Sequence, residues 1–445
     1  MILALLLACS RPSPQPSPQP TVVLISWDTT RADALSSYAD VRSWRPQEPD
    51  LGPSTPTADG LAARGTRFQW ALAHAPTTLS SHSSVMSGRD SHGHRVVRNG
   101  YPLPADLPLL AERFAAAGWD TIAVVGASTL EAGMGLNRGF RLYDDQVGTR
   151  VRARYEDRAD RVNERVFAAV DKGVARPLFL FVHYFDPHSP WDSASPEVRQ
   201  KFPQAGPAEP GPLVEKAVAG TLSDEEARAA RAAYLAEVAW TDQQTGLLLD
   251  GLRKRRLLDD SLVVLFSDHG EALDDPGSWP YGHGLDADLP ALHVPLIIAG
   301  SGRFAAPVGV DARPARLLDL GSTVLARVGL PGALGEGQDL FARTEALPSF
   351  AEATKPDAQE RTDAWNNLPF DRSVVDEGHL LRVTPLRGQS RLSRLGDSAV
   401  VDPERTERLR AKLEAWDAAA PGFREVELEE ETRKALEALG YVEGG

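Results

Sequence analysis

Short apolar runs alternate with amphipathic stretches along most of the chain. Four of the runs are continuous and rich in β-branched or aromatic residues, namely "TVVLISW" (21–27), "TIAVV" (121–125), "LFLFVHYF" (178–185) and "SLVVLFS" (261–267). Such runs are typical of strands buried on both faces of a sheet. Helix-periodic segments lie between them, for example "LPLLAERFAAAGW" (107–119). This alternation predicts an α/β fold, in which a central, mostly parallel sheet is flanked by helices.

The α/β pattern weakens beyond about residue 345. There "VVDEGHLLRVTP" (374–385) and "SRLSRLGDS" (390–398) predict two short strands, and "DPERTERLRAKLEAWDAAA" (402–420) predicts an amphipathic helix opened by Asp-Pro. We therefore expect a main domain over residues 21–344 and a small α+β subdomain over residues 345–445.

The first 20 residues, "MILALLLACSRPSPQPSPQP", have a different character. Their apolar run is too short to span a bilayer and ends in Leu-Leu-Ala-Cys, as the apolar core of a secretory signal would. The segment resembles a bacterial lipoprotein signal, which implies cleavage before Cys9, lipidation of its thiol and a Ser-Pro-Gln tether behind it. We expect an exported protein anchored to the bacterial membrane through Cys9, in the periplasm or at the cell surface. A clipped secretory signal is the alternative, because no Lys or Arg precedes the apolar run.

Composition and charge narrow the range of functions. The 445 residues are 42% hydrophobic, which is enough for one large core or two domains. The formal net charge of −14 disfavours nonspecific binding to nucleic acid, so no nucleic-acid partner is expected. An anionic substrate would need local compensation, for instance from metal ions. Cys9 is the only cysteine, which excludes a catalytic thiol and cysteine-ligated metals from the body of the chain.

Polar side chains follow three of the predicted strands. Asp28 follows the first strand, Asp186 and His188 follow the third, and Asp268 and His269 follow the last. In sheets of this kind ligands gather beyond the carboxyl ends of the strands. Carboxylates and imidazoles are ligands for Ca²⁺, Mg²⁺, Mn²⁺ or Zn²⁺, so the sequence predicts a divalent metal site with one or two ions.

Seven motifs resemble, in order, those of the sulfatase branch of the alkaline phosphatase superfamily. They are "DTTRAD", "APTTLSSHSSVMSGR", "SHGHRVVRNG", "FDPHSPW", "FSDHGE", "YGHG" and "HVPLII". The resemblance covers nearly the whole chain from Thr21, including connecting segments such as "RGFRLYDD" and the closing "ALEALGY". It implies an alkaline phosphatase-like sandwich, with a central sheet, flanking helices and a smaller C-terminal subdomain, that acts on sulfate or phosphate esters.

The resemblance places Thr78 at the nucleophile position. Sulfatases carry Cys-x-Pro-x-Arg or its Ser variant there, and oxidise the first residue to formylglycine. Here Ser80 replaces the Pro and His82 replaces the Arg. Threonine is a secondary alcohol and cannot yield the aldehyde, whereas phosphate-transferring relatives use an unmodified Thr or Ser. A helix starting near Leu79 would present its N–H groups to an anion, and one of the nearby hydroxyls should be its N-cap. The N-cap candidates are Thr77, Thr78, Ser80 and Ser81.

The resemblance also implies a set of metal ligands. Asp28, Asp268 and His269 correspond to ligands of the family, together with Thr78. Thr29 stands where many sulfatases place a second Asp. His269 stands where sulfatases with a single Ca²⁺ generally have Asn, which favours a transition metal or a two-metal arrangement.

Further residues are candidates for the rest of the site. Asp186, His188 and His283 are candidates for a second metal or for acid/base chemistry. Arg31 and Asn99 are candidates to bind the substrate's non-bridging oxygens, and a salt bridge is the alternative role for Arg31. The remaining, weaker candidates for direct contact are His82, His92 and His94.

These observations together predict an exported, metal-dependent hydrolase of sulfate or phosphate esters that uses Thr78 as nucleophile. One alternative is a transferase that passes a phospho-headgroup from a lipid donor to a glycan acceptor through the same Thr78 intermediate. Another is a degenerate family member that binds glycan without turnover. The sequence leaves open the substrate, the choice between phosphate and sulfate, the metal and the oligomeric state.

Overall fold

A computed structural model describes residues 20–41, 52, 54–147, 156–175, 177–206, 209–354, 371–385, 388–396 and 399–421. Its main feature is an eight-stranded sheet in the order β12-β2-β11-β7-β1-β6-β4-β5. Every neighbouring pair is parallel except those made by β11, which runs antiparallel to β7 and β2. The strands are β1 (Thr21–Trp27), β2 (Gly65–Phe68), β4 (Asp120–Val125), β5 (Leu142–Asp144), β6 (Leu178–Tyr184), β7 (Ser261–Ser267), β11 (Leu296–Gly300) and β12 (Gly309–Asp311). The predicted mostly parallel sheet is confirmed.

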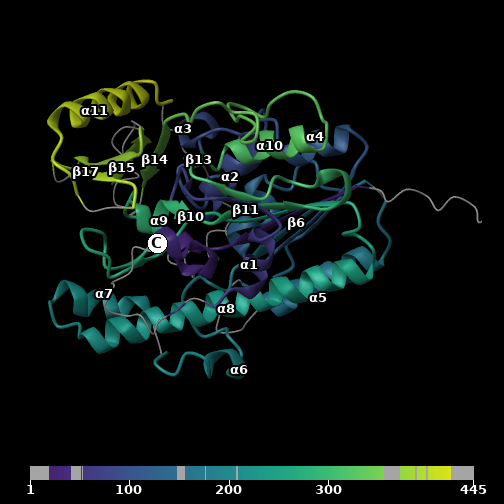
Figure 1. The fold of residues 1–445 in the computed structure, drawn as a ribbon, viewed down its shortest axis with the longest axis horizontal. Coiled ribbons are helices and arrows are strands. Elements are labelled where there is room, and N and C mark those ends of the chain that lie inside the picture. Colours follow the sequence, from purple (N-terminus) through teal and green to yellow (C-terminus); the bar gives the residue numbers. More distant parts are fainter. Residues whose placement is uncertain are drawn as a thin grey trace, which may run out of the picture.

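Helices cover both faces of this sheet (Figure 1). On one face lie α1 (Pro56–Ala62), α5 (Ala159–Asp171) and α8 (Asp224–Lys254), and on the other lie α2 (Thr78–Ser87), α4 (Leu110–Ala116) and α10 (Asp319–Arg327). Alternate residues of β1 point to opposite faces of the sheet. Val23 and Ile25 belong to the core under α5 and α8, whereas Val22 and Leu24 belong to the core under α2, α4 and α10. This two-sided burial explains why β1 is apolar at nearly every position.

Short helices and two small sheets lie outside the eight-stranded sheet. The short helices are α3 (Ser91–His94), α6 (Pro196–Arg199), α7 (Pro210–Val218) and α9 (Leu289–Leu292). The strands are β3 (Ala71–Leu72), β10 (His293–Val294) and β13 (Ala315–Arg316) in a three-stranded sheet, and β8 (Ala272–Leu273) and β9 (Tyr281–Gly282) in a hairpin. The Pro/Gly-rich stretch 193–226 reads as a loop insertion, but the structure places α6, α7 and the start of α8 in it. Proline at the first turn of α6 and α7 favours this, because that position needs no N–H partner.

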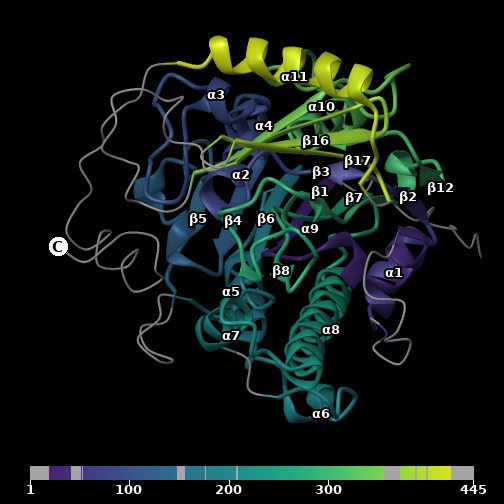
Figure 2. The same ribbon diagram turned by 90° about the vertical axis from the view of Figure 1, so that its left-hand side faces the viewer.

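A four-stranded antiparallel sheet forms the C-terminal part, in the order β14-β15-β16-β17. Its strands are β14 (Ser349–Ala353), β15 (Asp371–Asp376), β16 (His379–Thr384) and β17 (Gln389–Arg394), and α11 (Pro403–Ala418) lies across it (Figure 2). The segment 374–385, expected as one strand, is instead the end of β15, a turn and β16. The helix α11 opens at Asp-Pro as expected, since the Asp402 carboxylate accepts the N–H of Arg405.

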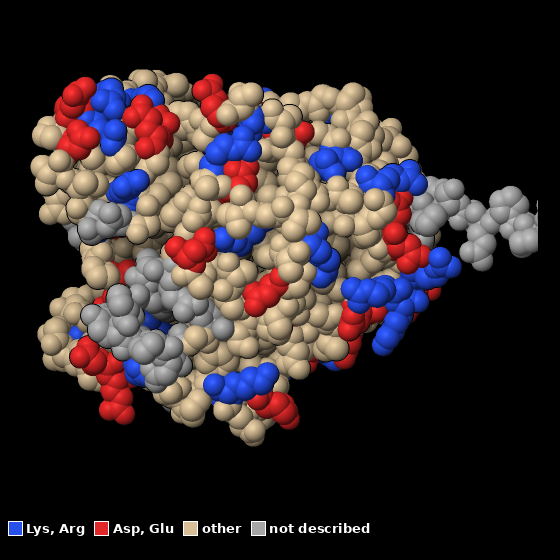
Figure 3. Space-filling view, in the orientation of Figure 1, with Lys and Arg blue, Asp and Glu red and all other residues tan. Residues whose placement is uncertain are grey.

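The surface carries charges of both signs. On the face drawn in Figure 3, basic and acidic side chains are interspersed. Many of them are paired, as Arg255 is with Asp171. None of the helices described is long and apolar enough to cross a membrane. The predicted lipoprotein signal with Cys9 and the closing "ALEALGY" lie outside the described residues.

Candidate active site

The candidate site lies at the carboxyl ends of three adjacent strands. β1 pairs with β7 through Trp27 and Ser267, so Asp28 and Asp268, the next residue of each strand, emerge side by side. His183, near the end of β6, lies opposite Ser26 of β1. β1 is also where the chain connections diverge to the two sides of the sheet, which is the usual place for a ligand site in this type of sheet.

Asp28, Asp268 and His269 form the group best suited to hold a cation. Each offers a ligand atom within 4.8 Å of the others, and all three residues are fully buried. His269 Nδ1 lies 3.0 Å from the carbonyl oxygen of Gly270. With the proton on Nδ1, the Nε2 lone pair faces the two carboxylates, which is the arrangement that metal-binding histidines adopt.

The unpartnered oxygens and raised pKa values of the two carboxylates suit a site for a cation. Among the described residues, Asp28 Oδ1 and Asp268 Oδ2 have no hydrogen-bond partner. Burial raises the pKa of Asp28 to about 7, and it also raises the pKa of Asp268, with the Asp28 charge adding to the effect. Burial opposes the charged form of His269, but the two carboxylates outweigh it and raise the pKa of that imidazole. Two carboxylates, an imidazole and a nearby alcohol fit a divalent cation such as Zn²⁺, Mn²⁺, Mg²⁺ or Ca²⁺.

Thr78 is the nearby alcohol. Its Oγ1 donates to Asp28 Oδ2 at 3.3 Å and lies 3.5 Å from His269 Nε2. α2 begins at Thr78, one residue before the expected start at Leu79. Thr77 is its N-cap, yet the Thr77 hydroxyl makes no capping bond. The hydroxyls at this helix start are therefore not explained by capping.

Asn99 closes one side of the start of α2. Its Oδ1 accepts the backbone N–H of Leu79 at 2.7 Å. Its Nδ2 is buried and has no hydrogen-bond partner among the described residues. An unpartnered buried N–H₂ beside a helix N-terminus provides a donor for an oxyanion, in keeping with the substrate-binding role predicted from the sequence.

Two buried histidines contact Thr78 and Asp28. His82 Nδ1 lies 2.7 Å from the Thr78 carbonyl and its Nε2 lies 2.9 Å from the Ser26 hydroxyl. His183 Nε2 donates to Asp28 Oδ2 at 3.1 Å, since its Nδ1 accepts the N–H of Gly126. Burial lowers the pKa of both imidazoles to about 4. His82, predicted to touch substrate, thus holds the Thr78 backbone instead, and His183, which sequence reasoning missed, orients Asp28.

His283 and His188 form a chain of neighbouring rings that starts at His269. The His283 ring is 4.6 Å from the His269 ring and 4.9 Å from the His188 ring, centre to centre. His283 Nδ1 also lies 3.3 Å from Glu271 Oε2, and Glu271 is fully buried. Of the three predicted candidates for a second metal or acid/base role, the structure therefore brings His283 next to the cluster and His188 next to His283, with a carboxylate that the sequence analysis did not single out.

Arg31 and Asp186 are placed differently from the other candidates. The Arg31 guanidinium binds both oxygens of Asp33 and both of Asp275, and is 2% exposed. This is the salt-bridge alternative rather than a substrate contact. Asp186 Oδ1 accepts the indole N–H of Trp240 at 2.7 Å, and Asp186 is not part of the group formed by Asp28, Asp268 and His269.

The backbone at Thr29 is strained. Its φ of 51° lies in the left-handed region, which is unusual for a β-branched residue. The hydroxyl of Tyr234, from α8, holds it by donating to the Thr29 carbonyl at 2.8 Å and accepting the N–H of Arg31 at 2.9 Å. The Thr29 N–H donates to Asp268 Oδ1 at 3.2 Å. Strain of this kind is common at functional sites. Here the strained residue follows Asp28 directly, and its N–H holds the Asp268 carboxylate.

His92 and His94 lie on α3, away from the group that could hold a cation. His94 Nε2 lies 3.0 Å from the Ser84 hydroxyl of α2. The His92 ring stacks at 3.6 Å on Trp416 of α11, and its Nε2 lies 3.3 Å from Glu352 of β14. Both histidines therefore make contacts that hold helices and the C-terminal sheet in place.

Comparison with known proteins gives a consistent picture. The family model described as Sulfatase matches residues 20–330. Choline-sulfatase of Rhizobium meliloti is 25% identical over 328 residues, which cover 62% of this chain and 63% of that protein. The multifunctional alkaline phosphatase superfamily protein PehA of Trinickia caryophylli is 22% identical over 80% of this chain and 81% of its own. The aligned chain thus spans less than two thirds of choline-sulfatase.

The fold has close counterparts among solved structures. The phosphonate monoester hydrolase of Agrobacterium radiobacter superposes with a TM-score of 0.66 and 21% identity, covering 91% of this chain and 96% of that one. At this identity the likeness concerns the fold alone. It confirms the predicted sandwich with a central sheet and a smaller C-terminal part.

Proposed function

Because this chain belongs to the sulfatase family, we propose that it is a metal-dependent hydrolase of sulfate or phosphate esters in which Thr78 is the nucleophile. The single observation that carries the proposal is the position of Thr78 Oγ1. It lies at the start of α2, within 3.5 Å of both Asp28 Oδ2 and His269 Nε2. An attacking oxygen, a helix N-terminus and a group suited to a cation therefore converge on one point.

Asp28, Asp268 and His269 would hold the cation, with Thr78 completing the set. When bound, a divalent cation supplies positive charge that favours ionisation of a nearby hydroxyl and offsets the charge on the ester oxygens. His183 fixes the orientation of Asp28 through its Nε2–H, and the Thr29 N–H fixes Asp268. These contacts keep the ligand atoms in place before a substrate arrives.

Thr78 would carry the covalent chemistry. Its hydroxyl proton points at Asp28 Oδ2, so the oxygen lone pairs are free to approach the ester. The hydroxyl proton passes to Asp28 Oδ2 as Oγ1 forms a bond to sulfur or phosphorus, and the bond to the leaving alcohol oxygen breaks on the opposite side. Water then gives a proton to an imidazole and attacks the same atom, the bond to Oγ1 breaks, and Oγ1 takes its proton back from Asp28. The start of α2 and Asn99 Nδ2 provide donors for the non-bridging oxygens.

His283 and His188 would serve the leaving group. The His283 ring lies beside His269, and the His188 ring lies beside His283. A protonated imidazole there can give its proton to the departing oxygen, and the neutral ring can later take one from the attacking water. Glu271 Oε2, at 3.3 Å from His283 Nδ1, can accept an N–H from the ring and orient it.

We also propose that the protein is exported and anchored to the membrane through a lipidated Cys9, with residues 10–20 as a tether to the folded part. The support is the sequence alone: an apolar run ending in Leu-Leu-Ala-Cys, followed by a Ser-Pro-Gln repeat. Residues 21–344 would form the catalytic domain and residues 345–445 the C-terminal subdomain.

The test combines a substrate panel with variants at two adjacent threonines. Wild type should release the anion from an aryl sulfate, a phosphomonoester or a phosphodiester. Thr78→Ala should lower turnover by at least about 10³-fold, as loss of a covalent nucleophile does. Thr78→Ser should keep part of the activity, because a primary hydroxyl can reach the same position. Thr77→Ala is the matched control and should stay near wild type, since the Thr77 hydroxyl makes no capping bond.

Mass spectrometry of acid-quenched enzyme locates the intermediate. The added phosphate or sulfate should appear on the peptide that contains Thr78. A label on Thr77 or Ser80 would shift the assignment of the nucleophile. Near-normal turnover of Thr78→Ala would replace the covalent mechanism with direct attack by water, and transfer of the group to an added alcohol or glycan acceptor would identify a transferase.

A further inference from the structure

We propose that Arg382, on β16 of the C-terminal sheet, is a positioning residue for His283 and acts through residues 274–288, here called the 274–288 loop. The loop belongs to the main domain, contains β9 and runs from the end of β8 to the start of α9. The proposal rests on the proposed function for the role of His283 in proton transfer. The proposal gives the C-terminal sheet a part in the reaction, although that sheet contributes no residue to the cluster of Asp28, Asp268 and His269.

The Arg382 guanidinium reaches into the loop at three points. Its Nη2 donates to Asp286 Oδ1 at 2.5 Å, and its Nη1 donates to the Gly277 carbonyl at 2.7 Å and to Asp288 Oδ2 at 3.2 Å. Its Nε donates to Asp371 of the neighbouring strand β15, which in turn orients the guanidinium. Arg382 is 8% exposed, so these charge-assisted bonds are largely shielded from water.

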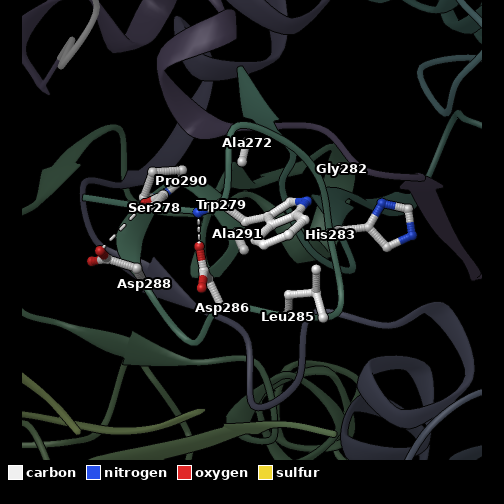
Figure 4. Close-up of a pocket in the computed structure, with 10 residues that line it drawn as sticks. All are labelled: Ala272, Ser278, Trp279, Gly282, His283, Leu285, Asp286, Asp288, Pro290 and Ala291. Atoms are coloured by element: carbon white, nitrogen blue, oxygen red, sulfur yellow. Dashed lines mark hydrogen bonds between the residues drawn. The ribbon is translucent and has the colours of Figure 1, made fainter. Parts of the chain in front are cut away.

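A second set of bonds ties the same carboxylates to the loop backbone. Asp371 Oδ2 also accepts the N–H of Ala287 at 3.1 Å. Asp286 accepts the N–H of Trp279, and Asp288 accepts the Ser278 hydroxyl (Figure 4). Both ends of the loop are thus held to the group of carboxylates that surrounds Arg382.

His283 lies within this loop. β9 pairs with β8 through Gly282 and Ala272, and His283 is the next residue after β9. In Figure 4 Trp279 lies in the middle of the loop, with Leu285 and His283 to one side of it. The residues that line this space leave no room for a water-sized sphere. Because the interior of the loop is filled, a shift of its carboxylates would be transmitted to the backbone at His283 rather than absorbed.

The charges around Arg382 explain why this one residue can control the position of the 274–288 loop. Asp286, Asp288 and Asp371 are all buried, and Arg382 is ion-paired with each of them. Without the guanidinium three buried carboxylates would face one another, and the strain would be relieved by moving the loop outward into water. His283 would then leave its place beside His269 and His188. Arg391, which binds Asp288 from a more exposed position, can offset only part of this.

The test compares two buried arginines of the same sheet. Arg382→Met removes the contact with the loop. Arg372→Met is the matched control, because Arg372 is also 8% exposed but pairs with Asp417 of α11 at 2.9 Å. Arg382→Lys keeps the charge without the planar fork and provides a milder variant if Arg382→Met folds poorly. Each is measured for kcat, KM and deuterium uptake of peptides covering residues 274–288, in the full-length protein.

We expect Arg382→Met to raise deuterium uptake over residues 274–288 and to lower kcat by about tenfold or more with KM little changed, since small misplacements of a reacting group are costly. Arg382→Lys should fall between it and wild type. Arg372→Met should leave both the deuterium uptake over residues 274–288 and kcat near their wild-type values. In the His283→Gln background, Arg382→Met should change kcat by less than about twofold, because the two residues act through one group.

Three results would overturn the inference. They are unchanged uptake of the loop in Arg382→Met, an equal loss of kcat in Arg372→Met, and additive losses in the double variant with His283→Gln. Failure of the proposed function looks different, because wild type itself would then turn over none of the ester classes. The uptake experiment still decides in that case whether Arg382 holds the loop.

Discussion

Replacing Asp186 by Asn should stabilise the protein at neutral pH and leave its metal content unchanged. Asp186 is 4% exposed, and its Oδ1 accepts the Trp240 indole N–H. Burial raises its pKa from 3.8 to about 7, despite the bond from Trp240. Asn can keep the bond to Trp240 without ever carrying a charge.

The sign and size of the effect follow from proton linkage. The unfolded chain releases this proton near pH 3.8, whereas the folded protein keeps it until about pH 7. The stability that the group contributes is therefore complete below the unfolded pKa and is lost as the pH rises through the folded pKa. At about 1.4 kcal/mol for each pKa unit, wild type should lose about 3 kcal/mol between pH 5 and pH 8 that Asp186→Asn does not lose.

Urea unfolding followed by tryptophan fluorescence at pH 5, 6, 7 and 8 measures this difference, and elemental analysis of the same samples measures bound metal. Asp250→Asn, at a 61% exposed side chain on α8, is the control and should show a difference below about 0.5 kcal/mol at every pH. A stability difference between Asp186→Asn and wild type that is flat with pH would refute the argument. A fall in bound metal in Asp186→Asn would restore the role of metal ligand that the sequence predicts for this residue.

Three further predictions concern the cation, Arg31 and the membrane. Asp268→Asn or His269→Ala should lower bound metal and abolish turnover while the fold survives, as judged by elemental analysis and circular dichroism; activity that persists in the presence of a chelator would contradict the site assignment. Arg31→Met should lower the free energy of unfolding by about 3–5 kcal/mol, because it leaves buried Asp33 and part-buried Asp275 without their partner, whereas a change confined to KM would indicate a substrate contact. Cys9→Ser should move the protein from the membrane fraction to the soluble fraction, and unchanged partitioning on immunoblots would exclude lipid anchoring through Cys9.

The elements and residues that the sequence predicts well are those set by local pattern. β1, β6 and β7 are recognisable because both of their faces are buried, and their ends bring Asp28, Asp268 and His269 together. His183 escaped sequence reasoning, although a histidine inside an otherwise apolar strand is itself a signal. The sequence predicts the start of α2 to within one residue. It does not show which of the hydroxyls there caps the helix and which takes part in the reaction, because that depends on the positions of the atoms.

Long-range ion pairs are what the sequence could not predict. Arg382 meets Asp286 and Asp288 across more than 90 residues of chain, and nothing in either segment indicates the other. Arg31 was the opposite case. Its partner Asp33 is two residues away in "DTTRAD", so the local sequence already contained half of its salt bridge.

The left-handed backbone at Thr29 has an evolutionary consequence. Aspartate and asparagine adopt that conformation more readily than a β-branched residue does. The sulfatases that this chain resembles often carry an Asp at this position, and the Thr29 hydroxyl has no hydrogen-bond partner among the described residues. The main chain at Thr29 thus has a shape that suits a carboxylate-bearing residue. Thr29→Asp therefore needs no remodelling of the fold, and it offers laboratory evolution a direct route to a site with one more negative charge.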